Sequence, residues 1–263
     1  METGRLDGGG GGPQPCAVLP LLLLFVAGLW AGTQNALAGG GSFITLPALI
    51  LFGLDPRAAN ITSTIALFPA QVATGMAGRS LVTGAEGLSF RTLVVISLIG
   101  GACGALLLLV TPSAIFAAMV PWLVLFATAM FAYGSFGRKP VTAETRLPPW
   151  GAVAAQFGIA VYGGYFGGGI GFLMLAALTM AGLAVRNAGA TKNVLAAVMN
   201  ASAVVILAFS GEVDWTRAGA LGSGALIGGL LGAWALTRVN EKALRVGVVL
   251  IGIALTVGLF LRK

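Results

Sequence analysis

The stretch Thr92–Val110, which reads TLVVISLIGGACGALLLLV, decides the class of fold. It contains no charged residue, and it is close to the length of about 20 apolar residues that a helix needs to cross a bilayer. One such stretch would also fit a buried helix of a soluble protein. That alternative fails here because apolar segments lie on both sides, at 16–30, 42–52, 58–77, 115–133, 152–165, 170–185, 188–210, 218–236 and 246–261.

The composition supports the same class. Hydrophobic residues make up 57% of the 263 residues and charged residues 9%, whereas soluble domains carry about 25% charged residues. The net charge is +7, but the charges stand singly between apolar runs. We therefore interpret them as loop charges next to the membrane, and we expect no nucleic-acid partner.

Two of the apolar segments, 42–52 and 170–185, are too short to span a bilayer in a straight helix. Each follows a run of three glycines. Short, glycine-flanked apolar segments are typical of half-helices or re-entrant segments in transporters.

The chain divides into four parts. Residues 1–16 form a glycine-rich tail that we expect to be disordered. Residues 17–136 form a first membrane repeat, 137–150 a polar and proline-rich cytoplasmic linker, and 151–263 a second membrane repeat. The predicted fold is an all-α polytopic membrane protein of two homologous repeats. Each repeat has about four transmembrane helices and a glycine-broken or re-entrant half-helix.

The two repeats are recognised from an ordered series of matches. The glycine triplets begin at Gly39 and Gly167, and Leu98-Ile99-Gly100-Gly101 reappears as Leu226-Ile227-Gly228-Gly229, each 128 residues later. Pairs separated by 129 residues are Arg57 and Arg186, Thr62 and Thr191, Thr64 and Asn193, and Gln71 and Asn200. Internal repeats are common in transporters, where the substrate lies between them. A duplicated, non-transporting scaffold is the competing interpretation.

The glycine triplets are candidate parts of an anion site. They comprise Gly39, Gly40, Gly41, Gly167, Gly168 and Gly169. A helix that restarts after a break directs its free N–H groups and the positive end of its dipole inward, which favours an anion. The alternative is close packing of helices through small residues. The occurrence of a triplet at the same place in both halves favours the anion site.

Polar residues inside apolar segments complete the candidate site. Thr64 and Gln71, like Asn193 and Asn200, are seven residues apart, or about two helical turns, so each pair shares a helix face. The full set is Asn60, Thr62, Ser63, Thr64, Gln71, Thr191, Lys192, Asn193 and Asn200. Lys192 either pairs with an anionic substrate or extends to the interface from a helix end. Arg57 and Arg186 are interpreted as loop charges.

Several chemistries are absent from the pattern. The carboxylates fall in expected loops or the tail, and there is no histidine, so no buried proton relay is visible. Cys16 and Cys103 have no metal-ligand spacing. No nucleotide-binding lysine motif or catalytic triad is present. We therefore expect no metal, no cofactor and no enzymatic activity.

The chain resembles the sulfite exporter, or TauE/SafE-like, family of membrane transporters. The resemblance rests on Ala38-Gly39-Gly40-Gly41 leading into Thr45-Leu46-Pro47, on Asp55–Thr64, and on the counterparts Gly167–Gly171 and Gly189–Asn193 with Asn200. It covers about Leu19 to Leu261. It implies a two-repeat transporter of about eight helices for sulfur-containing anions such as sulfite or organosulfonates. Ser63 stands where the second half has Lys192, so only the second half supplies a cation.

These observations together predict a secondary transporter that exports a small sulfur-containing anion by alternating access between the repeats. The expected partners are the anionic substrate and the lipid bilayer, and a homo-oligomer is left open. The expected location is the bacterial inner membrane, crossed several times. The alternatives are a non-transporting scaffold or accessory subunit, and a transporter of a different small solute.

The orientation depends on how residues 17–54 cross the membrane. If they cross once in net, nine Lys and Arg residues lie on the side of the N-terminus and five lie opposite. If they cross twice, the side opposite the N-terminus holds nine and the N-terminal side five. The excess of positive charge on cytoplasmic loops makes the linker cytoplasmic in both cases and leaves the termini undecided.

Overall fold

The computed structural model describes residues 15–37, 40–77, 79–85, 87–136, 148–235 and 241–261. These residues form α-helices, one 3-10 turn and an isolated bridge between Ala85 and Leu88, and none of them forms a strand. The predicted all-α class is confirmed. Gly39, the tail residues 1–14 and the linker residues 137–147 lie outside the described residues, so the predictions made for them stay predictions.

Ten α-helices make up the described structure. They are α1 Pro15–Leu37, α2 Ser42–Leu51, α3 Pro56–Ala77, α4 Phe90–Val110, α5 Ser113–Phe136, α6 Pro149–Tyr165, α7 Ile170–Met180, α8 Val185–Ala208, α9 Trp215–Ala235 and α10 Glu241–Leu261, with a 3-10 turn η1 at Arg79–Leu81. Four are long and apolar enough to cross a membrane, through Val18–Ala36, Phe90–Val110, Ser113–Met130 and Asn187–Ala208. The two segments predicted to be short are α2 and α7.

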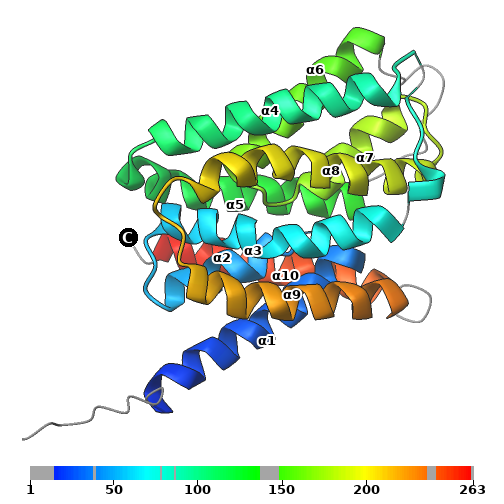
Figure 1. The fold of residues 1–263 in the computed structure, drawn as a ribbon. Helices are drawn as coiled ribbons and strands as arrows, with labels where there is room; N and C mark the ends of the chain where they lie inside the picture. The colour runs from blue at the N-terminus through cyan, green and yellow to red at the C-terminus, as the bar shows by residue number, and fades with distance from the viewer. Residues whose placement is uncertain are drawn as a thin grey trace, which may run out of the picture.

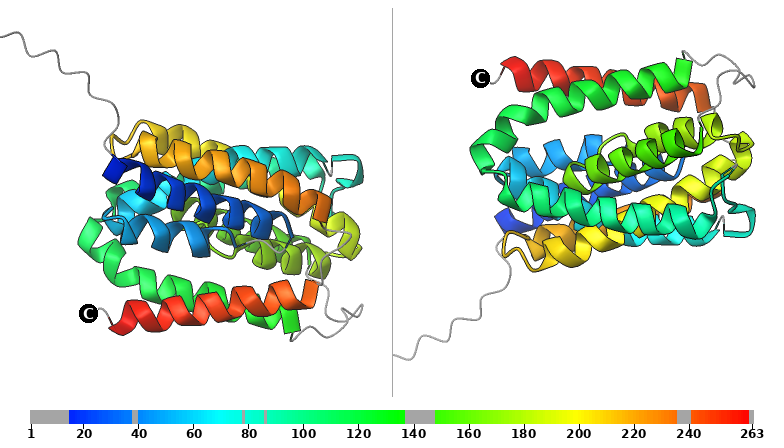
Figure 2. Two further views of the ribbon diagram at one scale, coloured as in Figure 1. Left: turned by 90° about the horizontal axis from the view of Figure 1, so that it is seen from below. Right: turned by 90° about the horizontal axis from the view of Figure 1, so that it is seen from above.

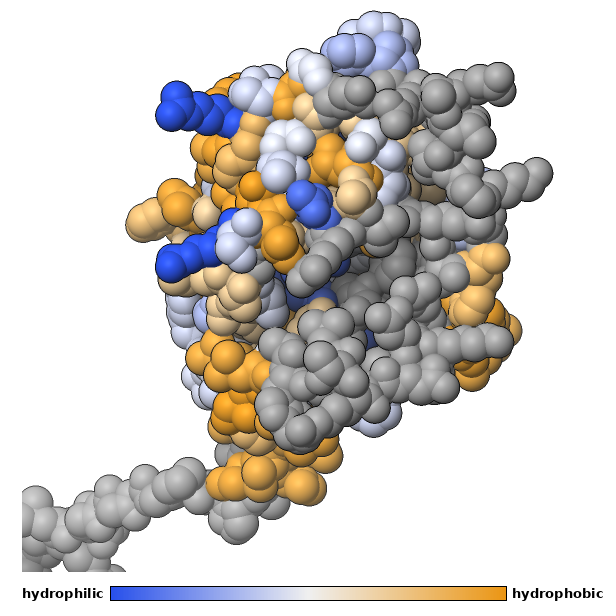
Figure 3. Space-filling view, turned by 90° about the vertical axis from the view of Figure 1, so that its right-hand side faces the viewer, coloured by the Kyte–Doolittle hydropathy of each residue, from blue (hydrophilic) through white to orange (hydrophobic). Residues whose placement is uncertain are grey.

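The long helices run alongside one another between two ends of the molecule (Figure 1). One end, here called the termini end, holds the start of α1, the end of α10 and the loops at 52–55, 111–112 and 209–214. The other, the linker end, holds the end of α5, the start of α6 and the loops at 79–89 and 181–184 (Figures 1 and 2). Hydrophilic residues gather on the face at the linker end (Figure 3).

The first helix packs along α9 through small residues. A Cβ placed on Gly28 would lie 2.0 Å from the carbonyl oxygen of Leu221, and one on Gly228 would lie 2.0 Å from that of Leu29. Only glycine permits this approach. In lipid the hydrophobic effect does not drive helices together, so close packing of their backbones holds them instead. The same device joins α4 to α6, where a Cβ on Gly104 would lie 2.1 Å from the carbonyl oxygen of Val161.

Both short helices end in the same way. After α2, Gly53 adopts φ +89° while the amide of Leu54 donates to Leu49. After α7, Gly182 adopts φ +92° while the amide of Leu183 donates to Leu178. This is the glycine-terminated helix end that satisfies the last carbonyls and turns the chain. It lets α2 and α7 stop after about three turns and reverse direction.

The outer faces of the helices are apolar. Large hydrophobic side chains such as Leu22, Ile99, Leu107 and Leu230 remain about half exposed on α1, α4 and α9. A soluble monomer rarely exposes apolar area on this scale. Lipid solvates such a surface, so the packing agrees with a protein that crosses a bilayer.

The packing of α1 on α9 predicts that Gly228→Ala lowers stability. The added methyl group would meet the Leu29 backbone, and overpacking costs about 1–3 kcal/mol. Thermal unfolding in detergent measures the effect. Gly219→Ala, on the same helix with no atom within 4 Å of the added Cβ, is the control and is expected to be neutral or stabilising. Equal midpoints for the two variants would contradict this account.

Candidate substrate-binding site

The two helix breaks lie beside each other inside the molecule. The first separates α1 from α2, and the second, residues 166–169, separates α6 from α7. A Cβ placed on Gly167 would lie 3.8 Å from Ser42 Oγ and 4.0 Å from Thr64 Oγ1. The second break therefore contacts both the first residue of α2 and the middle of α3.

Glycine is required at three positions in the breaks. Gly40, Gly167 and Gly169 have φ values of +84°, +78° and +74°. Residues with a Cβ rarely adopt this left-handed conformation. The breaks thus depend on residues that the sequence singled out as triplets.

The two restarting helices differ at their first turns. In α2 the amides of Phe43 and Ile44 donate to the carbonyls of Gly40 and Gly41 at 3.0 Å. In α7 the amide of Gly171, which corresponds to Phe43 as the second residue of its helix, has no acceptor among the described residues. Open amides at a helix start are a ready anion site. The second break is therefore the better donor.

Asn60 and Thr64, on α3, cover the second break. The buried Asn60 donates from Nδ2 to the carbonyl of Tyr165 at 3.0 Å, which satisfies the end of α6. Thr64 Oγ1 donates to the carbonyl of Asn60 at 2.9 Å and faces Gly167. On the same helix, Ser63 Oγ shares a 2.5 Å hydrogen bond with Thr45 Oγ1 of α2.

A polar pair connects α3 with α8. Asn200 Nδ2 donates to Gln71 Oε1 at 2.5 Å. Asn200 is 2% exposed, and its Oδ1 has no hydrogen-bond partner among the described residues. A buried acceptor without a partner is costly, so Asn200 Oδ1 is suited to accept from a ligand or a water molecule.

Two of the predicted site residues hold loops instead. Thr62 Oγ1 accepts from the amide of Asp214 at 3.2 Å, at the termini end. Thr191 Oγ1 accepts from the amide of Thr83 and donates to its carbonyl, both at 3.1 Å, toward the linker end. Both hydroxyls are therefore engaged by the protein itself.

Lys192 and Asn193 are half-buried and lie away from the breaks. Lys192 precedes Asn200 by eight residues, which is about 12 Å along a helix, in the direction of the linker end. Within the described residues no carboxylate forms an ion pair with the Lys192 ammonium. Lys192 thus lies between the candidate site and the linker end.

An apolar pocket of about 190 Å³ adjoins the breaks. It extends along α2 from Ser42 to Leu51 and is closed by α5, α10 and the Phe166 side chain. Among the described lining residues, Ser42 contributes the only hydroxyl group. The pocket can accommodate a hydrocarbon group, while its end at Ser42 approaches the polar residues of the breaks.

The structure brings together part of the predicted site. Gly40, Gly41, Asn60, Ser63, Thr64 and the second triplet gather around the breaks, Gln71 and Asn200 meet each other, and Thr62, Thr191, Lys192 and Asn193 lie elsewhere. Sequence reasoning missed Ser42, Thr45 and the Gln34 side chain, whose Nε2 donates to the carbonyl of Gly40 at 3.4 Å. The position of Ser42 directly after a glycine triplet was a usable signal.

Helices that break inside an apolar bundle, with polar groups covering the breaks, define the transporter class of polytopic membrane protein. Residues 24–259 match the family model described as sulfite exporter TauE/SafE. The chain belongs to this family, which is one of membrane transporters and not of enzymes. The predicted resemblance is confirmed.

Bacterial relatives align over most of the chain. The probable membrane transporter protein ORF9 of a Sinorhizobium species is 32% identical over 254 residues, or 94% of each chain. A probable membrane transporter protein of Haemophilus influenzae is 28% identical and covers 90% of this chain and 92% of its own length. The probable membrane transporter protein YfcA of Escherichia coli K12 is 26% identical and covers 89% and 88%. No solved structure matches the chain.

The contact between Gln71 and Asn200 predicts energetic coupling. A double-mutant cycle with Gln71→Ala and Asn200→Ala, followed by unfolding in detergent, should give a coupling energy of about 0.5–1.5 kcal/mol. The control cycle pairs Asn200→Ala with Ser223→Ala, an exposed hydroxyl that donates within its own helix. In the control cycle the two changes in unfolding free energy should be additive. Additive changes in the Gln71 and Asn200 cycle as well would refute the coupling.

Proposed function

We propose that the protein exports a small sulfur-containing anion, such as sulfite or an organosulfonate, by alternating access between two repeats. The observation that carries the proposal is the meeting of the two glycine breaks beside polar residues of α3. The family description names sulfite export, which makes a sulfur oxyanion the first substrate to test.

The proposal of two repeats is supported by contacts that recur at the same spacing. The helix ends at Gly53 and Gly182, and the loop-holding hydroxyls of Thr62 and Thr191, are each 129 residues apart. Gln71 and Asn200, also 129 residues apart, contact each other. A residue that meets its own counterpart lies on the axis that relates the two halves. The boundary between the halves thus passes between α3 and α8.

The relation proposed between the repeats is inverted. The first half begins at the termini end with α1, and the second begins at the linker end with α6 (Figure 1). Each half then has a short helix that returns toward its starting end, followed by three long helices. Inverted repeats of this kind are common in secondary transporters and place the substrate near mid-membrane.

The same arrangement favours the second of the two orientations weighed from the sequence, because α3 starts at the same end as α1. In this orientation the count made from the sequence assigns nine Lys and Arg residues to the side opposite the N-terminus, which is the side of the linker end. The same count assigns five to the side of the N-terminus. The positive-inside rule then makes the linker end cytoplasmic and the termini end external.

The binding mode follows from the donors at the breaks. The anion would accept hydrogen bonds from the α7 amides and from the Ser42 hydroxyl, with Thr64 beside it. Asn60, Ser63, Gln71 and Asn200 would line the cavity around it. An alkyl or aryl group of an organosulfonate would occupy the apolar pocket along α2. Lys192 and Asn193 would attract the anion from the cytoplasmic side.

Ligand binding tests the proposed cargo. Sulfite or a short organosulfonate should raise the unfolding midpoint of the detergent-purified protein, because a ligand at 100 times its Kd stabilises the folded state by about 2.7 kcal/mol. Thiosulfate, sulfate and a cationic solute are compared at equal ionic strength. Lys192→Ala and Ser42→Ala should weaken the shift, and Gly219→Ala is the matched control. Equal shifts for every anion and every variant would refute a specific sulfur-anion site.

The proposed orientation has its own test, which requires no substrate. In a background of Cys16→Ala and Cys103→Ala, the exposed positions Thr216 and Ser80 are each replaced by cysteine. A membrane-impermeant maleimide added to intact cells should label the Thr216→Cys variant, since it lies at the termini end. The Ser80→Cys variant should react only after permeabilisation. The opposite pattern would reverse the orientation.

A further inference from the structure

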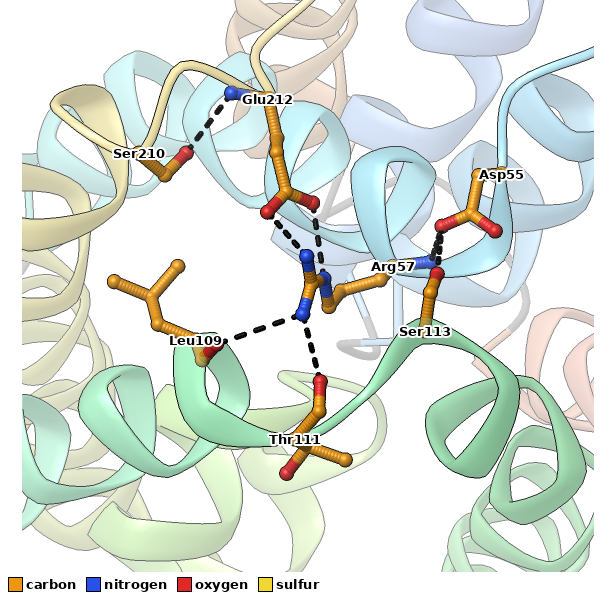
Figure 4. Close-up of polar contacts among 7 residues, drawn as sticks. All are labelled: Asp55, Arg57, Leu109, Thr111, Ser113, Ser210 and Glu212. Atoms are coloured by element: carbon orange, nitrogen blue, oxygen red, sulfur yellow. Dashed lines mark hydrogen bonds and ion pairs between the residues drawn. The ribbon is translucent and has the colours of Figure 1, made fainter.

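Arg57, in the first turn of α3, holds three elements together at the termini end (Figure 4). Its Nε and Nη2 donate to the two carboxylate oxygens of Glu212, at 2.9 and 2.5 Å. Its Nη1 donates to the carbonyl of Thr111 at 2.7 Å and makes a longer contact of 3.5 Å with that of Leu109. The guanidinium thus binds the α8–α9 loop and the end of α4 at once.

Both partners of this ion pair are fixed in place by further hydrogen bonds. The amide of Arg57 donates to Asp55 Oδ2 at 3.1 Å, and Ser113 Oγ donates to the same oxygen. The amide of Glu212 donates to Ser210 Oγ at 3.2 Å. The two charged side chains are 20% and 28% exposed. A bidentate, partly buried pair of this kind is stronger than an exposed surface pair.

The ion pair joins the two halves of the chain. Arg57 belongs to the first half and Glu212 to the second, and 155 residues separate them. In alternating access the halves move against each other, so some of the contacts that cross between them at one end break when that end opens. The Arg57–Glu212 pair is such a contact at the termini end.

The sequence does not repeat the carboxylates of this contact at the equivalent positions of the other half. At the spacing of 129 residues, Arg57 corresponds to Arg186, but Glu212 corresponds to Thr83 and Asp55 to Ala184. Thr83 instead makes neutral hydrogen bonds with Thr191. At these equivalent positions, a carboxylate partner occurs only at the termini end. The two halves thus differ in the residues that they supply at these positions.

We propose that Arg57 and Glu212 form a latch that keeps the termini end closed in the resting protein and opens once in each transport cycle. The inference rests on the proposed alternating-access function, and it adds which end is closed and which residues close it. The resting protein is therefore accessible from the linker end. Occupation of the central site is what separates the halves and breaks the latch.

Accessibility of a buried thiol tests the latch without any substrate. In the background of Cys16→Ala and Cys103→Ala, Thr64→Cys places a thiol next to the second break with little change in size. An impermeant thiol reagent is added to the side of the termini end. Glu212→Gln and Arg57→Gln should each raise the labelling rate about tenfold, which corresponds to about 1.4 kcal/mol in the opening equilibrium. The labelling rate of the Arg57→Lys variant should lie between those of the parent protein and the glutamine variants, because lysine keeps the charge but cannot form the bidentate hydrogen bonds of arginine.

Cross-linking tests whether the latch must open during transport. Arg57→Cys with Glu212→Cys is joined by a short bis-maleimide in proteoliposomes, and sulfite flux should stop. Each single cysteine variant, treated in the same way, should retain its flux. A matched control joins Asp55→Cys to Ser113→Cys, which lies at the same end but within the first half, and it should retain flux after cross-linking.

The outcomes separate the latch from the proposed cargo. Undiminished flux after cross-linking of Arg57→Cys to Glu212→Cys, or unchanged labelling in both glutamine variants, would overturn the latch. A loss of stability alone would lower the unfolding midpoint without this side-dependent labelling, and that result would also overturn it. Increased labelling in a protein that moves none of the tested anions would support the latch and refute the cargo.

Discussion

A helix that breaks inside a bilayer exposes amide and carbonyl groups that lipid cannot hydrogen-bond, and the architecture of this protein follows from covering two such breaks. Gln34 Nε2 binds the carbonyl of Gly40, and Asn60 Nδ2 binds that of Tyr165. The second of these bonds crosses between the halves. Polar side chains are therefore needed within apolar helices, and the two halves must stay packed against each other.

Residues at equivalent positions in the two halves make hydrogen bonds at different ends of the molecule. Thr62 holds the loop before α9 and Thr191 holds the loop before α4, so each threonine anchors the opposite half. Gln71 and Asn200 hold each other at the boundary. Hydrogen bonds between halves thus occur toward both ends and between them. Relative motion of the halves would have to exchange contacts at one end for contacts at the other.

The sequence predicted the helical class and the two short helices because hydropathy and glycine positions are local properties. Residues 42–52 and 170–185 were identified as short, and α2 and α7 are short. The hydrogen-bond partner of a side chain, by contrast, depends on residues far away in the sequence. Thr62 bonds to Asp214, 152 residues away, and no periodicity reveals that its hydroxyl is occupied. For the same reason Arg57 was interpreted as a loop charge, although its guanidinium joins α3, the α4 end and the α8–α9 loop.

The distribution of charge bears on how an anion could be driven outward. Within the described residues, the side chains of Asp55, Glu212 and Asp214 all lie at the termini end. Two of these carboxylates pair with arginines, Glu212 with Arg57 and Asp214 with Arg217. Among the described residues, Arg79 and Arg91 are exposed at the linker end, and a cationic entrance raises the local concentration of an anion.

In the proposed orientation, an inside-negative membrane potential also favours anion exit. It contributes about 2.3 kcal/mol per elementary charge per 100 mV. By the rule of about 1.4 kcal/mol per factor of ten, this corresponds to a roughly 40-fold concentration ratio. Export of an anion therefore needs no buried carboxylate or imidazole to relay protons, since the charge of the cargo itself couples its movement to the membrane potential. Import against the same potential would require a coupled cation and residues to bind it. In the proposed orientation the membrane potential by itself thus favours the outward over the inward movement of an anion.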